Sequence, residues 1–358
     1  MTSEPQHDTD HSNTEGKLAM MKYNAKKLAL TSLAPAALAV LASPALADQP
    51  AAQADEAAPA EAGEGGAITA SSKDGQRLNI ELGVLPRYVG NYFESQDEFN
   101  VTGPATPARS VAVITLSGTI SYDLISEQRK RLTAAVRLRH NIFTDLDNAN
   151  STDVDVTLTY DARPSQFRLG YFGTRHKLVS DSPTDPVYGK TDGFSAAYLH
   201  RLTKRLRGQV GYRYSHTGYA LFPDRNLDQH QYSAELRYQV QRYFMPAVGV
   251  EHTRGNAALD SRSYKRNAFY LSVTSEIGQT AYINLRYRHS KREYLTDLPT
   301  DSYFGREDPR DDFSAYGTVQ LGGGLSLFGF FNHTTNDSNQ PSHRFKSDEG
   351  GLGLFYRF

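Results

Sequence analysis

From residue 76 to the end of the chain, apolar and polar residues alternate in stretches separated by breaks. Residues 132–139 give a clear example: leucine, alanine and valine stand at even positions, and threonine, alanine and arginine stand at odd ones. A period of two is the pattern of a β-strand that has one apolar and one polar face. This part of the chain is therefore expected to form a sheet with a dry side and a wet side.

Fourteen segments follow this pattern, at 77–92, 110–124, 130–143, 152–161, 165–175, 191–202, 206–216, 230–241, 244–253, 266–275, 279–290, 312–321, 325–333 and 346–358. The connection after every second segment is short, whereas the others are long and polar, up to the segment 291–311. Soluble sandwiches give no reason for such alternation, but outer-membrane barrels have short periplasmic turns and longer extracellular loops.

The fold class predicted from these patterns is all-β: a transmembrane antiparallel up-and-down β-barrel of about 14 strands over residues 76–358. An open sheet in lipid would leave backbone groups without hydrogen bonds at its edge, so closure is required. An even strand count places both ends of the barrel on the periplasmic side.

The first part of the chain carries an export signal. Residues 1–20 are polar and are expected to be untranslated or disordered. Residues 21–47 combine a basic start, an apolar run at 28–41 and the A-x-A site Ala45-Leu46-Ala47, which is the layout of a signal peptide cleaved after Ala47. Pro35 and Pro44 interrupt a run that is already short for a transmembrane helix.

Residues 48–75 are rich in Ala, Glu, Gly and Pro and are expected to be a disordered periplasmic tail. The predicted location is the outer membrane of a Gram-negative bacterium.

Composition excludes several classes of function. The chain has no Cys, so it has no disulfide framework, thiol catalysis or Cys-ligated metal. Its net charge of −1 gives no field that would attract nucleic acid.

Aromatic residues near the segment ends fit the girdles of a membrane barrel, namely Tyr88, Tyr92, Phe93, Tyr122, Phe143, Tyr171, Tyr214, Tyr243, Phe244, Tyr287 and Phe313.

The final segment alternates up to a C-terminal phenylalanine. Leu354, Tyr356 and Phe358 share one face. This ending resembles the recognition signal that outer-membrane proteins present to the barrel assembly machinery, so that machinery is an expected partner.

Three segments have a more specific texture: FGRED at 304–308, GLSLFGF at 324–330 and NDSN at 336–339. They resemble the end of the barrel domain of surface lipoprotein assembly modifiers and of related β-barrel porins. The resemblance implies a barrel of this size. Members of that family usually carry a helical-repeat domain before the barrel, and this chain is expected to lack it.

If the apolar faces meet lipid, the opposite faces line the lumen. The lumen-lining arginines are then Arg137, Arg139, Arg168, Arg213, Arg237, Arg286 and Arg288, against Asp153, Asp155, Asp161, Glu235 and Glu251. One interpretation is a wall that favours anionic solutes. The other is a structural ladder of arginine–carboxylate pairs that braces neighbouring strands.

A second charged group is expected in the loops, at Asp297, Asp301, Glu307, Asp308, Asp311 and Asp312. These carboxylates are either solvated or hold divalent cations that bridge lipopolysaccharide, which with the membrane lipids is an expected partner.

The predicted function is a porin-like channel for small polar or anionic solutes. The alternative is a secretion barrel for a surface lipoprotein or polysaccharide, in which case the partner is an exported cargo. An outer-membrane hydrolase or protease is the third hypothesis, since Ser215-His216, His289-Ser290 and the group Asp311, Asp312 and His333 offer the residue types. The serine and histidine of each of these pairs are neighbours on a strand and therefore point to opposite faces, so no enzymatic activity is expected. No cofactor or metal is expected either.

Overall fold

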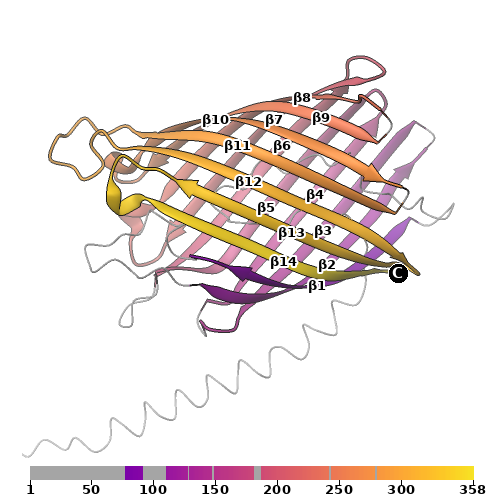
Figure 1. Cartoon of the computed structure of the whole chain (residues 1–358), viewed down its shortest axis with the longest axis horizontal. Helices are drawn as coiled ribbons and strands as arrows, with labels where there is room; N and C mark the ends of the chain where they lie inside the picture. The colour runs from indigo at the N-terminus through magenta and orange to yellow at the C-terminus, as the bar shows by residue number, and fades with distance from the viewer. Residues whose placement is uncertain are drawn as a thin grey trace, which may run out of the picture. The chain divides into compact units, whose positions relative to one another are not determined.

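The computed structural model describes residues 77–91, 110–127, 129–146, 149–180, 187–241, 243–278 and 280–358. Over these ranges the chain forms fourteen β-strands that close into one barrel (Figure 1). The expected leader at 21–47, its cleavage site after Ala47, the tail at 48–75 and residues 1–20 all lie outside the described residues. Within the described ranges, no helix has the length and apolarity needed to cross a bilayer.

The strands have the following bounds: β1 Leu78–Val89, β2 Val111–Ser126, β3 Lys130–Phe143, β4 Ser151–Ala162, β5 Ser165–Ser180, β6 Val187–Arg201, β7 Leu206–Tyr219, β8 Leu227–Tyr238, β9 Phe244–Ala257, β10 Tyr264–Ile277, β11 Ala281–Tyr294, β12 Glu307–Gly322, β13 Leu325–Asn336 and β14 Phe345–Arg357. Three single 3-10 turns lie between strands: η2 Pro223–Arg225, η3 Asp260–Arg262 and η4 Pro341–His343.

Each strand pairs antiparallel with its sequence neighbours, and β1 closes the ring by pairing with β14. The predicted antiparallel up-and-down barrel of fourteen strands is confirmed. The alternation in the sequence specifies this fold because a shift of one residue in any ladder would turn every apolar side chain of that strand inward.

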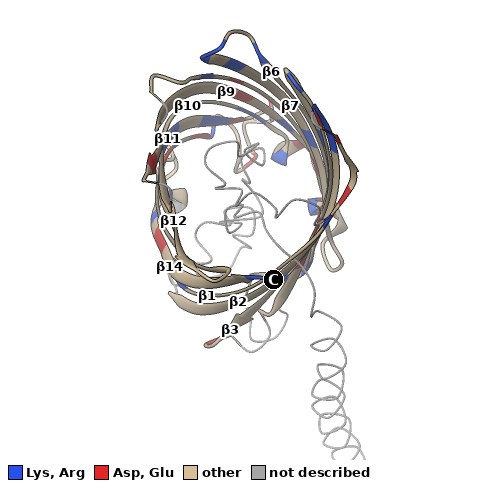
Figure 2. Cartoon of the chain, turned by 90° about the vertical axis from the view of Figure 1, so that its right-hand side faces the viewer, with Lys and Arg blue, Asp and Glu red and all other residues tan. Residues whose placement is uncertain are grey.

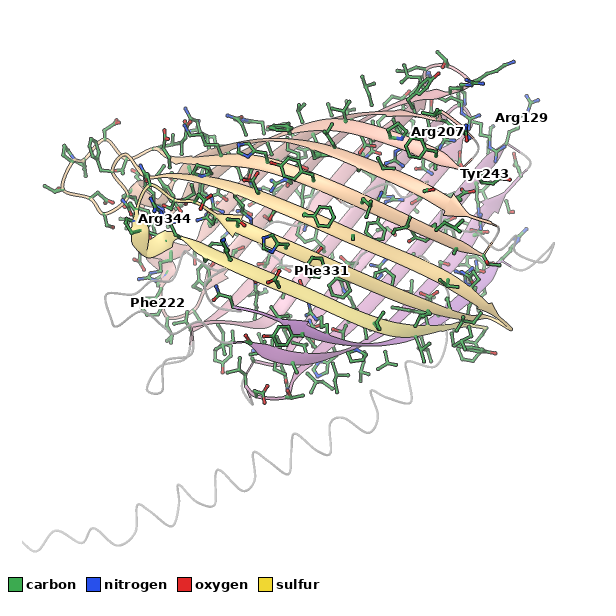
Figure 3. All side chains as sticks on the ribbon, in the orientation of Figure 1. Arg129, Arg207, Phe222, Tyr243, Phe331 and Arg344 are labelled. Atoms are coloured by element: carbon green, nitrogen blue, oxygen red, sulfur yellow. The ribbon has the colours of Figure 1, made fainter. Side chains whose placement is uncertain are left out.

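Connections alternate in length between the two ends of the barrel. Those after even-numbered strands are turns of two to five residues, and those after odd-numbered strands have six to twenty-one residues. Figure 3 labels Arg129, Arg207 and Tyr243 at the turn end, and Phe222 and Arg344 at the loop end. β1 begins and β14 ends at the turn end, as the even strand count requires.

The two faces of the strands differ in chemistry. On β2, Ile114 and Ile120 point outward and are exposed, whereas Thr115 and Thr119 point inward and are buried. Apolar side chains cover the outward surface over the middle of the barrel. The charged residues are spread around the wall (Figure 2). An apolar exterior with a polar interior is the arrangement of a barrel that sits in lipid.

The aromatic girdle is largely where the sequence placed it. Exposed outward rings are Tyr88, Tyr122, Tyr171, Tyr243, Phe244, Tyr287 and Phe313. Phe143 was wrongly assigned to the girdle, because it has the same parity on β3 as Arg139 and points inward. There it is buried with Val113 and Leu146. Tyr92 and Phe93 lie outside the described residues.

Many strands extend further at the loop end than expected. β11 runs to Tyr294 and β12 begins at Glu307, so the loop predicted over 291–311 is confined to 295–306. Of the six carboxylates expected in loops, Glu307, Asp308, Asp311 and Asp312 therefore belong to β12. Beyond the membrane both faces of a strand meet water, and the apolar alternation disappears although the ladder continues.

The joint between β1 and β14 is the least paired in the barrel. It contains seven residue pairs, with a gap at Leu85 and Pro86, whereas β10 and β11 share fourteen pairs. Proline has no backbone N–H to donate to a ladder. At this gap, β14 carries Gly353, whose missing side chain leaves room for Leu85. We refer to this joint as the seam.

Candidate functional site in the barrel interior

The registers of the ladders place all seven predicted arginines on the inward face. Arg137 lies opposite Thr119, and Arg168 lies opposite Thr159, both inward positions. The full set is Arg137 and Arg139 on β3, Arg168 on β5, Arg213 on β7, Arg237 on β8 and Arg286 and Arg288 on β11. Their part in passing a solute stays a prediction.

A carboxylate on β9 anchors two of these arginines. Arg286 donates to Glu251 Oε1 at 3.0 Å, and Arg288 donates to Glu251 Oε2 at 3.1 Å. The Glu251 side chain is only 1% exposed. A buried carboxylate of this kind requires both partners, because an unpaired charge away from water is costly.

The same network reaches in both directions around the wall. Toward the loop end, Arg288 also donates to Asp312 on β12, and Arg310 donates to the other oxygen of Asp312 at 2.8 Å. On the other side, the Arg286 guanidinium lies 3.9 Å from the ring centre of Tyr270. The Tyr270 hydroxyl donates to Glu235, which also accepts from Arg237. Charges of alternating sign thus connect β8 to β12.

The wall formed by β3 to β7 has a different balance. Arg139 donates to Asp155 at 3.0 Å and lies 3.8 Å from Asp153. Arg213 stacks on Phe172, with its guanidinium carbon 3.5 Å from the ring centre. With Arg137 and Arg168, the predicted inward charges of this wall are four arginines and three aspartates, the third being Asp161 on β4.

The inward charges differ between the two parts of the wall. From β8 to β12 they form a ladder of arginine–carboxylate pairs. The remaining predicted acidic position, Asp161 on β4, has the predicted facing, since it lies opposite Arg131, an inward residue of β3. From β3 to β7 the predicted arginines therefore outnumber the predicted aspartates by one.

Several inward partners were missed by the sequence analysis. Arg310 was missed because the predicted strand begins at 312, and Asp312, at its first position, was counted with the loop carboxylates, although both continue the inward positions of β12. Arg87 and Glu349 form an ion pair across the seam, and Arg87 also reaches Asn141 on β3. Only the register of β1 on β14 brings Arg87 and Glu349 together, and sequence spacing carries no signal for it.

Two of the segments singled out in the sequence meet at the loop end. The Asn339 side chain donates to the carbonyl of Gly305 at 2.8 Å and accepts from the backbone N–H of Glu307 at 3.0 Å. Its backbone N–H donates to the Glu307 carbonyl at 3.0 Å. The segments 304–308 and 336–339 are thereby joined into one unit, which we call the mouth clasp.

A buried arginine stiffens the mouth clasp. Arg306 makes a two-pronged ion pair with Asp308, at 2.9 and 2.8 Å, and its side chain is fully buried. Its guanidinium lies 4.8 Å from the ring centre of Tyr294 and 5.5 Å from that of Tyr303. The packing indicates that this part of the sequence shapes the mouth of the barrel.

The serine and histidine of each pair considered for hydrolysis point to opposite faces of the wall, with Ser290 inward and buried and His289 outward. Ser215 points inward and bonds Gln229, whereas His216 points outward and bonds Asp228. Likewise Asp312 points inward, while Asp311 and His333 point outward. Asp311 contacts His289, and His333 contacts Asp348.

The model of the surface lipoprotein assembly modifier family matches residues 134–343, from β3 to η4, which is more than half of the chain. The chain belongs to the surface lipoprotein assembly modifier family. The resemblance seen in the sequence motifs is confirmed, and this family member is an outer-membrane β-barrel. No curated protein matches the chain.

Solved structures of outer-membrane proteins are similar to this family member over most of their length. OmpT of Vibrio cholerae has a TM-score of 0.45 and 8% identity, with 78% of this chain and 97% of that chain covered. The outer membrane channel DcaP of Acinetobacter baumannii has a TM-score of 0.43 and 10% identity, covering 78% and 96%. The anion-selective porin of Comamonas acidovorans has a TM-score of 0.39 and 11% identity, covering 78% and 98%.

Proposed function

We propose that this barrel acts in surface lipoprotein assembly, as the outer-membrane conduit by which an exported lipoprotein reaches the outer face of the cell. The family match carries the proposal, because residues 134–343 run from within β3 to the end of η4 and so make up most of the barrel. The proposed role is transport of a cargo and involves no chemical reaction.

The chemistry of the interior supports this role. A polypeptide that crosses a membrane must find hydrogen-bond partners for its backbone, and lipid supplies none. The inward faces of the strands supply hydroxyl, amide and charged groups, such as Thr115, Gln231 and Asn284. An extended segment of cargo would find a polar wall along its path.

The test compares the surface of host cells with and without the gene. Proteins on intact cells are labelled with a reagent that does not cross the membrane and are then quantified. We expect at least one lipoprotein to lose most of its surface label in the deletion strain, while its total amount in the cell is unchanged. Restoration by the parent gene completes the test. Equal surface labelling of every lipoprotein in the two strains would contradict the proposal.

A second candidate function, the passage of small anions, is favoured by the wall of β3 to β7. Four predicted arginines face three aspartates on this wall, an excess of one positive charge, since guanidinium groups stay charged at physiological pH. The paired network of β8 to β12 adds little to it.

Reversal potentials in planar bilayers test the second candidate. We expect chloride to be preferred over potassium, and less so at 1 M salt, where charges are screened within ~3 Å. The pair Arg168→Gln with Arg213→Gln removes two positive charges from this wall and should weaken the preference more than Arg237→Gln, which removes one charge from the network of β8 to β12. Preference for potassium in the parent would refute anion passage, and absence of conductance would leave lipoprotein transport as the only proposed role.

A further inference from the structure

Five histidines lie at one level on the outward face of the barrel, where the interior network plays no part. Each stands within six residues of the loop end of an odd-numbered strand. They are His140 on β3, His216 on β7, His252 on β9, His289 on β11 and His333 on β13, and we call them the histidine belt.

Each belt histidine is fixed by the residue directly opposite it on the next strand. His216, His289 and His333 contact aspartates through Nδ1, at 2.9, 2.8 and 2.7 Å. The Nδ1 atoms of His252 and His140 contact Asn267 at 2.7 Å and Thr152 at 3.0 Å. With Nδ1 held toward the neighbouring strand, the Nε2 edge of each ring is turned away from that partner. The Nε2 atom of His333 lies 3.3 Å from Thr335 Oγ1 on the same strand.

The belt lies between two other rows on the outward face. Two residues nearer the turn end, three of the same strands carry the aromatic side chains Tyr214, Tyr287 and Phe331. Aromatic rings of this kind mark the boundary between hydrocarbon and headgroups. Two residues nearer the loop end stand Arg254 and Lys291. The belt is therefore at the headgroup level of the outer leaflet.

The opposite end of the barrel has no such row in the described strands. The outward histidine there is His200 on β6, which contacts Ser165 at 2.8 Å. The asymmetry matches the asymmetry of the outer membrane, whose outer leaflet carries phosphorylated glycolipid and whose inner leaflet carries phospholipid.

The chemistry of the belt fits a phosphate oxygen. In an imidazolium both ring nitrogens carry a proton, so Nδ1–H can donate to the neighbouring strand while Nε2–H donates outward. Further cations stand beside the belt, namely Arg254, Lys291 and the Lys265 that lies opposite Arg254. The two lysines form ion pairs with Glu293, and Lys291 also pairs with Glu307. A charge-assisted hydrogen bond to phosphate is among the stronger kinds of hydrogen bond in proteins.

We propose that the histidine belt binds the phosphorylated headgroups of lipopolysaccharide in the outer leaflet. Five fixed imidazoles around the circumference would hold a shell of this lipid against the barrel. This proposal does not depend on which cargo or solute uses the interior.

The experiment uses the full barrel reconstituted in two kinds of vesicle, one of phosphatidylcholine and one containing lipopolysaccharide. The measured quantity is the temperature at which the barrel loses its folded mobility on a gel. We expect lipopolysaccharide to raise this temperature for the parent, and replacement of all five belt histidines by Asn to remove at least half of that rise. Replacement by Arg should keep the rise, because a cation at the same level still meets phosphate.

Two controls test whether the rise comes from the belt and from the lipid. His200→Asn should keep the full rise, since it changes the same residue type at the other end. Inorganic phosphate added to phosphatidylcholine vesicles should give no rise, which separates the lipid from the free anion. If the fivefold variant fails to fold in phosphatidylcholine, the pair His289→Asn with His333→Asn is measured instead. A full rise in the folded Asn variants, or an equal loss in His200→Asn, would overturn the proposal.

Discussion

Arg288 shows, at the scale of one residue, why the interior wall uses arginine. Its guanidinium donates to Glu251 on β9 and to Asp312 on β12. A planar group with five N–H donors in fixed directions serves two carboxylates at once, which a lysine ammonium does with less defined geometry. One side chain on β11 is thereby bonded to the adjacent strand β12 and, across β10, to β9.

Removal of the arginines around Glu251 should weaken the barrel. The pair Arg286→Gln with Arg288→Gln leaves a buried carboxylate without either ion partner, and breaking a buried pair costs about 3–5 kcal/mol. We expect a lower temperature of unfolding in the gel-mobility assay. Adding Glu251→Gln should recover part of the loss, because the stranded charge is then gone. If the double variant unfolded at the same temperature as the parent, water inside the barrel would be screening this network.

Adjacent residues of β3 provide a matched test of facing. Val136 is exposed on the lipid side, and arginine near the membrane midplane costs ~2–4 kcal/mol. Val136→Arg should therefore reduce the folded fraction in outer-membrane extracts. Arg137→Ala, on the inward side, should leave most of it folded. The reverse order of the two variants would mean that the ladder of β3 is shifted by one residue.

Facing could be predicted residue by residue, but partners could not. Parity alone placed Arg286, Arg288 and Glu251 inside, because the period of a strand is two. That they form one ion cluster depends on the registers of β9 on β10 and of β10 on β11. Register follows from packing and turn geometry, and the charges themselves do not encode it.

At the scale of elements, each of the fourteen strands could be found from the sequence, but many of their loop ends could not. Apolar alternation exists only where one face meets lipid. At the start of β12 charged side chains stand on both faces: Glu307 and Asp311 point outward, and Asp308 and Arg310 point inward. The two segments of the mouth clasp could be singled out in the sequence, but their contact could not be predicted, because the spacing between 304–308 and 336–339 carries no information about it.

Loss of the Asn339 side chain should loosen the mouth clasp. Asn339→Ala removes two hydrogen bonds to the backbone at Gly305 and Glu307, each worth about 0.5–1.5 kcal/mol. We expect a protease added outside intact cells to cut within 295–306 faster than in the parent. Asn256→Ala is the control, since Asn256 contacts Arg254 on the outward face. Equal cutting in parent and Asn339→Ala would show that the loop is held by other contacts.

The seam should be the first joint of the barrel to open. Its seven residue pairs, interrupted at Pro86, leave it less protected than the fourteen pairs of β10 and β11. Hydrogen exchange followed by mass spectrometry should therefore be faster for the amides of β1 and β14 than for those of β10 and β11. Exchange at the same rate in both joints would argue that side-chain contacts such as Arg87 with Glu349 compensate.

At the scale of the whole molecule, the processed chain should begin at Asp48. The A-x-A site before it and the ending on Phe358 both predict export and assembly in the outer membrane. N-terminal sequencing of protein purified from outer membranes measures this directly. Residues 1–20 on the membrane-bound protein would show that the leader assignment is wrong.

Because each strand pairs with its neighbours in sequence, the barrel is a closed row of hairpins. A gene change that duplicates or deletes one hairpin alters the circumference by two strands and leaves the facing and register of every other strand unchanged. The ends of the barrel also stay on the same side of the membrane. A lineage of such proteins is therefore free to vary the width of its barrel in even steps, by recombination between hairpins, without redesigning the rest of the wall.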